Sequence, residues 1–142
     1  MSTKDVRTTG TTRKTSELLI VTKNELGSLA RITAPLAKNR INIECFSGYE
    51  WGTEAAFRLV TDNNRKAGEL LKNEGFSVQE TPVVLWQTGS TPGKLHDATV
   101  ALAEARVNTY SSYSTTLTGT REATAVLNTS DATKTMEVLK RI

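Results

Sequence analysis

Two stretches of the chain carry the same pattern of apolar and polar positions, 66 residues apart. The first runs from Gly27-Ser28-Leu29 through Ile32, Leu36 and Ala37 to Ile41-Asn42, and the second from Gly93-Lys94-Leu95 through Ala98, Leu102 and Ala103 to Val107-Asn108. Self-similarity at a fixed period of this size indicates a duplicated structural unit, so the sequence predicts two copies of about 65 residues each.

Within the first copy, the apolar pattern predicts strands and helices in a fixed order. Residues 18–22 form a short β-branched run typical of a buried strand, and residues 29–40 carry apolar positions at helical spacing. Alternating positions on either side of a turn near Gly48–Gly52 predict a hairpin. A second helix, capped by Asp62 and ended by Gly75, precedes a fourth strand. This β-α-β-β-α-β order indicates an α+β, ferredoxin-like fold with an antiparallel sheet and its helices on one face.

The second copy repeats this order but stops early. It predicts a strand at 83–86, a helix at 92–105, a hairpin within 107–128 and a helix at 131–141. Its hairpin is two residues longer than the first, because the second helices align at an offset of 68. The last strand of the copy is missing from the sequence. The open sheet edge that results needs a partner, and we expect either another subunit or the N-terminal tail to supply it.

The positive charge of the chain lies at its N-terminus. The formal net charge is +3, and residues 1–16 account for all of it. Because this segment is rich in Thr, Ser and Gly and has little apolar surface to bury, we expect a disordered basic tail, with electrostatic docking to an acidic partner as the alternative. The expected domains are therefore the tail at 1–16, a first unit at 17–81 and a second unit at 82–142.

Composition also bears on the compartment. A single cysteine excludes an internal disulfide framework, and the first 16 residues contain no apolar run typical of a secretory signal. No stretch approaches the roughly 18 consecutive apolar residues that a membrane span needs. We expect a soluble, cytoplasmic protein without a membrane partner.

The segments around the two glycines resemble a known family. Asn24-Glu25-Leu26-Gly27-Ser28-Leu29, followed by Asn42, is similar to the ACT domain, and Ser90-Thr91-Pro92-Gly93-Lys94-Leu95, followed by Asn108, resembles it too. The resemblance covers the chain from Leu18 onward and implies a tandem pair of small regulatory modules that bind amino acids, in proteins that carry no catalytic domain of their own. It also implies that the ligand binds at the loop between the first strand and the first helix, where two domains meet.

Elementary chemistry supports a ligand at such a loop. A helix N-terminus leaves N–H groups unpaired and concentrates about half a positive charge, which suits a carboxylate. A glycine there allows a ligand to approach the backbone closely. By resemblance, the ligand-binding residues are Asn24, Glu25, Leu26, Gly27, Ser28, Leu29 and Asn42 in the first copy, and Ser90, Thr91, Pro92, Gly93, Lys94, Leu95 and Asn108 in the second. In the alternative interpretation Asn24 only caps a helix, the glycines only form turns, and Leu29 and Leu95 pack in the core.

The sequence shows no residues for catalysis. Cys45 and His96 are single, the carboxylates are scattered, and no phosphate-binding Gly-rich motif occurs, so we expect neither an enzyme nor a metal or cofactor. We expect a ligand sensor that forms a homodimer or higher homo-oligomer and acts on a regulated enzyme or regulator in trans. Two alternatives remain: a structural oligomerisation subunit without a ligand, or an RNA-binding ferredoxin-like module. RNA is not favoured, because residues 53–61 lack the basic-Gly-aromatic signature and the body of the chain is neutral.

Overall fold

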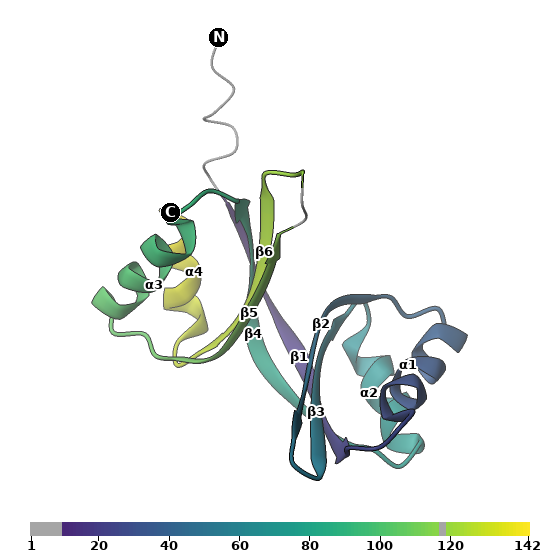
Figure 1. Ribbon diagram of the computed structural model, residues 1–142. Coiled ribbons are helices and arrows are strands. Elements are labelled where there is room, and N and C mark those ends of the chain that lie inside the picture. Colours follow the sequence, from purple (N-terminus) through teal and green to yellow (C-terminus); the bar gives the residue numbers. More distant parts are fainter. Residues whose placement is uncertain (1–9, 117–118) are drawn as a thin grey trace. The chain divides into compact units, whose positions relative to one another are not determined.

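The computed structural model of the protein describes residues 10–116 and 119–142 (Figure 1). The described residues form six strands and four helices in an α+β arrangement. In chain order the elements are β1 (Thr11–Lys23), α1 (Ser28–Lys38), β2 (Ile43–Trp51), β3 (Glu54–Thr61), α2 (Asn64–Asn73), β4 (Ser77–Gly89), α3 (Lys94–Glu104), β5 (Thr109–Thr116), β6 (Glu122–Thr129) and α4 (Ala132–Leu139). The strand pairs β1/β3, β2/β3, β4/β6 and β5/β6 are antiparallel.

The element bounds repeat along the chain as the sequence pattern predicts. Both ends of β1 and of α1 recur 66 residues later in β4 and α3. The offset becomes 68 at the start of β6 and of α4, so the second hairpin is two residues longer than the first. The duplication and the position of its insertion are confirmed.

The chain divides into two compact units, which share two strands. The first unit is Ser16–Thr81, and the second combines residues 10–15 with Pro82–Ile142. The division therefore cuts β1 after Thr15 and β4 after Thr81, and each of these strands contributes one end to each unit.

In the first unit, α1 and α2 cover one face of strands in the order β2-β3-β1-β4 (Figure 1). β1 pairs with β3 in a register that sets Leu18 opposite Leu59 and Ile20 opposite Phe57. Alternate strand residues and one stripe of each helix meet in a core that contains Leu18, Ile20, Ile32, Leu36, Leu59, Ala67, Leu71 and Phe76. The core holds the N-terminus of α1 in place at the end of β1.

In the second unit, α3 and α4 pack on strands in the order β1-β4-β6-β5 (Figure 1). Its core contains Val84, Trp86, Ala98, Leu102, Val107, Ala125, Leu127, Val138 and Leu139. The fourth strand position of this unit, beside β4, is occupied by residues 11–15 of β1. Gly10 lies close to β4. A Cβ added to Gly10 would be 2.6 Å from the Gln87 carbonyl oxygen, which is too short for a real contact.

Two expectations need correction. The disordered tail over residues 1–16 is wrong for residues 11–16, which belong to β1; residues 1–9 lie outside the described part of the chain. The polar composition of these residues predicted disorder, but a strand that pairs with another strand is held by backbone hydrogen bonds and needs little apolar surface. The cap of α2 is Asn63, whose side chain accepts from the Lys66 N–H, whereas Asp62 accepts from the Asn42 N–H at 3.1 Å.

Candidate functional site

The two strand–helix loops share one backbone conformation. Gly27 and Gly93 occupy the N-cap positions of α1 and α3 with φ of 86° and 89°, and neither helix has a side-chain cap hydrogen bond. L-residues avoid this left-handed region, so glycine is required at both positions. No atom lies within 4 Å of a Cβ added to either glycine, so both loops are open rather than buried.

The first loop is tied down by its own hydrogen bonds. Asn24 does not cap α1; its Nδ2 donates to Glu50 Oε2 at 2.6 Å and its backbone N–H donates to the Thr53 carbonyl at 2.8 Å, which attaches the loop to the β2–β3 hairpin. Ser28 is 4% exposed, and its hydroxyl donates to the carbonyls of Lys23 and Glu25. The polar groups expected to bind a ligand here are therefore largely used within the loop.

Asn42 does not join the first loop within its own unit. It precedes β2, where its N–H and carbonyl bond Asp62, whereas Glu50, the partner of Asn24, lies near the far end of that strand. At about 3.3 Å per strand residue, roughly 25 Å of strand separate the two. Asn108 is placed in the same way at the start of β5, where it bonds Ser130. A role for either asparagine needs a neighbouring domain.

The second loop lines a cavity of about 180 Å³ inside its own unit. Four of the residues singled out from the sequence line it, Ser90, Thr91, Lys94 and Leu95, whereas Pro92, Gly93 and Asn108 do not. The remaining lining residues come from β4, β6 and β5 and were not predicted: Trp86, Thr88, Gly89, Ser114, Thr116, Ala123 and Ala125. Ser90 attaches the loop to β5 and to the segment before β6. Its N–H donates to the Arg121 carbonyl at 2.7 Å, and its Oγ lies 3.2 Å from Thr116 Oγ1.

Hydroxyl groups and a cation supply the polar part of the wall of this cavity. Lys94 is the one charged residue among the described residues that line it, and its Nζ donates to the Ile142 carbonyl at 2.7 Å. Trp86 and Thr88 are 2% and 9% exposed, and their Nε1 and Oγ1 atoms are buried without a hydrogen-bond partner. Among the described residues, the wall therefore has one positive charge and several hydroxyl groups, and no carboxylate.

The leucines that follow the two glycines are not core residues. Leu29 is 36% exposed and Leu95 is 57% exposed, so the interpretation that both pack in the core is wrong. The buried positions are Ser28, Ile32 and Leu36 in α1, and Ala98 and Leu102 in α3, so neither leucine belongs to the buried face of its helix.

The aromatic side chains of β2 and β3 divide between surface and core. Phe57 is 9% exposed and belongs to the core of the first unit. Tyr49 and Trp51 are 45% and 77% exposed, and together with Leu19 and Val21 they line a shallow hollow of about 260 Å³. The first unit therefore has an exposed aromatic surface, although β3 contributes no exposed aromatic side chain to it.

The described residues also bear on metal binding and membrane insertion. Within the described ranges, no three His, Cys, Asp or Glu side chains are grouped so that they could hold a metal ion. The helices of residues 10–116 and 119–142 include none that is long and apolar enough to cross a membrane.

Comparison with known proteins identifies similar chains. A family model described as an ACT domain pair matches residues 13–141. Protein BT0572 from Bacteroides thetaiotaomicron is similar with 28% sequence identity and a TM-score of 0.83, over 92% of this chain and 89% of that one. The ligand-free regulatory subunit of aspartate kinase from Thermus thermophilus matches with 14% identity and a TM-score of 0.68, over 95% and 97% of the two chains.

The regulatory subunit of aspartate kinase from Thermus flavus also matches, with 14% identity and a TM-score of 0.64, over 95% of this chain and 94% of that one. At these identities the two kinase subunits show a shared fold. A search among curated proteins found no match.

Proposed function

Because the chain belongs to the family of ACT domain pairs, we propose that it is a non-enzymatic regulatory protein that binds a small carboxylate-bearing metabolite, with amino acids as the first candidates. The site is the cavity beside the second strand–helix loop. The observation that carries this proposal is the coincidence of that cavity with four residues, Ser90, Thr91, Lys94 and Leu95, that the family resemblance had already singled out.

The lining suits a compact anion. Lys94 supplies the positive charge, and the N-terminus of α3 adds its partial positive charge at the same end of the cavity. An α-ammonium group would be met by hydroxyl and carbonyl oxygens, because the lining has no Asp or Glu. The cavity volume of about 180 Å³ is small beside the roughly 300–1,000 Å³ of pockets that bind drug-sized ligands, so a nucleotide does not fit.

The first loop has a different part in this proposal. Its Asn24 and Ser28 side chains are engaged within the unit, so it contributes to binding only where a second domain brings Asn42 or Asn108 toward it. Binding then biases how domains or subunits pack, and a regulated enzyme in trans reads the change. A ligand shifts such an equilibrium only by its differential affinity for the two arrangements.

The test is a thermal-shift screen of the twenty amino acids and of small carboxylates without an ammonium group. A specific ligand raises the melting temperature by mass action. The screen compares wild type with Gly93→Asp and with its matched control Gly27→Asp. Both glycines have a left-handed φ, 86° and 89°, and open surroundings, so the backbone cost is similar, but only Gly93 directly precedes a residue of the cavity lining, Lys94. We expect the shift to be lost in Gly93→Asp, where the added carboxylate repels the ligand, and retained in Gly27→Asp.

Other outcomes have distinct meanings. If the rise in melting temperature is lost only in Gly27→Asp, the ligand binds at the first loop instead. If no compound raises the melting temperature of wild type, the sensor function is contradicted. In that case, salt-dependent retention of RNA that disappears in a Tyr49→Ala, Trp51→Ala variant would support the RNA-binding alternative, because both side chains are exposed stacking faces.

A further inference from the structure

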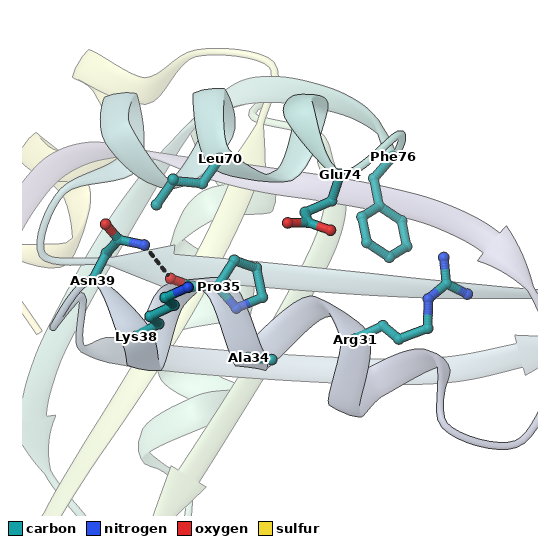
Figure 2. Close-up of a pocket in the computed structure, with 8 residues that line it drawn as sticks. All are labelled: Arg31, Ala34, Pro35, Lys38, Asn39, Leu70, Glu74 and Phe76. Carbon is teal, nitrogen blue, oxygen red and sulfur yellow. Dashed lines mark hydrogen bonds between the residues drawn. The ribbon is translucent and has the colours of Figure 1, made fainter.

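A groove lies between the two helices of the first unit, with a volume of about 530 Å³ (Figure 2). One wall is a stripe of α1 that we call the α1 stripe: Arg31, Ala34, Pro35 and Lys38. Figure 2 shows Arg31 and Lys38 toward the two ends of this wall, with Leu70, Glu74 and Phe76 across from it. The groove therefore has a small apolar middle between two cations.

The cationic ends of the α1 stripe are partly held in place. The Arg31 guanidinium lies 5.1 Å from the centre of the Phe76 ring, and its Nη1 lies 3.4 Å from Glu25 Oε1. Its side chain is still 56% exposed, so the charge is available at the surface. Near Lys38, the Asn39 Nδ2 donates to the Pro35 carbonyl at 2.8 Å, which keeps the end of the helix closed.

The duplicated helix carries the same stripe with reversed charge. The positions 66 residues after the α1 stripe are Asp97, Val100, Ala101 and Glu104, which we call the α3 stripe. Asp97 and Glu104 are exposed, and Val100 is 40% exposed. Residues at i, i+3, i+4 and i+7 share one helix face, so each stripe is a continuous surface. The duplication has thus kept the spacing and the apolar middle while exchanging two cations for two carboxylates.

We propose that the α3 stripe of one copy of this chain docks into the α1–α2 groove of a second copy. Val100 would pack over Ala34 and Pro35, where the groove offers only small side chains. Because each stripe has one charge at either end, Asp97 and Glu104 meet Arg31 and Lys38 whichever way the helices run. Charge complementarity is the argument for a second copy as the occupant, since the matching surface is on the same sequence.

Two features set the expected strength of this contact. A single helix in a groove buries less than the ~1,600 Å² of a standard interface, so the association is weak and sensitive to salt. Glu74 is the one acidic residue in the lining, and it opposes the incoming carboxylates. Since every chain carries both surfaces, the contact is made twice in a closed dimer or repeats along an open chain.

The test uses two charge-reversed chains and sedimentation velocity. Variant one carries Arg31→Glu and Lys38→Glu, so both stripes are acidic; variant two carries Asp97→Lys and Glu104→Lys, so both are basic. We expect wild type to associate at low salt and to dissociate at ~1 M salt, where the screening length is about 3 Å. Each variant alone should stay monomeric. Their equimolar mixture should associate again, because both contacts are then complementary.

Further variants complete the experiment. Lys66→Glu with Lys72→Glu makes the same charge change on exposed positions of α2 outside the groove lining, and it should leave association intact. Glu74→Gln should strengthen association measurably. The proposal is wrong if either charge-reversed chain associates as wild type does, if the mixture fails to associate, or if wild type is monomeric at low salt. None of these readouts depends on a ligand, so this proposal and the sensor function fail independently.

Discussion

At the scale of single residues, the pair Glu17 and Arg58 shows how burial controls charge. The Glu17 side chain is fully buried, the Arg58 side chain is 18% exposed, and Arg58 Nη1 lies 2.7 Å from Glu17 Oε1. Burial on its own lowers the pKa of Arg58, but the hydrogen bonds and charges of Glu17 and Tyr49 outweigh it and raise the pKa above its ordinary value. The guanidinium therefore remains charged beside Glu17.

Replacing Arg58 should be costly. Arg58→Met removes the counterion and leaves the Glu17 carboxylate buried, so we expect the free energy of unfolding to fall by about 3–5 kcal/mol. The matched control is Arg65→Met, since the Arg65–Glu69 pair is 3.7 Å long with side chains 91% and 65% exposed. Such surface pairs contribute little, and the control should unfold as wild type does. Urea unfolding measures both, and equal losses in the two variants would contradict the role of burial.

The same scale separates what could be predicted at the site from what could not. Gly27 and Gly93 were predicted because a glycine before an apolar helical pattern is a local signal, and their positive φ values agree. Ser114, Thr116 and Trp86 were not predicted as lining residues. Ser114 and Thr116 lie on β5 and Trp86 lies on β4, and an isolated strand pattern does not say which side chains face a cavity.

At the scale of elements, α2 has one glycine inside it and another two residues after its end, in opposite environments. Gly68 lies inside the helix and is buried, and the nearest atom to an added Cβ is Leu18 Cδ2 at 3.9 Å, an ordinary contact distance. Gly75 follows the helix with φ of 94°, where the N–H of Phe76 closes the end by donating to the Leu71 carbonyl at 3.0 Å. One glycine weakens the helix and the other ends it.

Alanine should therefore have opposite effects at the two positions. Gly68→Ala should raise the free energy of unfolding by about 0.5–1 kcal/mol, because glycine in a helix interior loses more backbone freedom on folding than alanine does. Gly75→Ala should lower it by about 1–2 kcal/mol, because alanine resists the left-handed conformation. Thermal and urea unfolding of the two variants measure the sign of each change in the free energy of unfolding. A destabilised Gly68→Ala would mean that the space beside Leu18 cannot take a methyl group.

At the scale of the whole molecule, β1 and β4 each have residues in both units. Residues 11–15 of β1 belong to the second unit and the rest of the strand to the first, while β4 is divided at Thr81. Loss of either unit therefore removes ordered neighbours from both strands of the other. We infer that the two units unfold together rather than in sequence.

This inference predicts a single calorimetric transition. Leu36 lies at 0% exposure in the core of the first unit and Leu102 at 2% in that of the second, so alanine at either position should cost about 2–5 kcal/mol. Each variant should shift the whole transition downward, with the calorimetric enthalpy still equal to the van't Hoff enthalpy. Two resolved transitions, only one of which moves in each variant, would show that the units unfold independently.

Local and repeated features of this protein follow from its sequence. Apolar periods and backbone preferences that act over a few residues determine four of these features. They are the duplication, the order of the elements within each copy, the two-residue insertion and the glycine at each helix start. Those signals are independent of where the rest of the chain lies, and the structure agrees with them. Membership in the ACT domain pair family follows from the same segments.

The tertiary structure alone decided which segments lie together. Residues 11–15 are polar and were taken for a tail, yet they complete the second unit beside β4, because strand pairing uses backbone groups that every residue possesses. The cavity likewise combines side chains from β4, α3, β5 and β6, and the α1–α2 groove combines two helices that are separated by a hairpin. Each of these depends on contacts between distant residues, which no local pattern encodes.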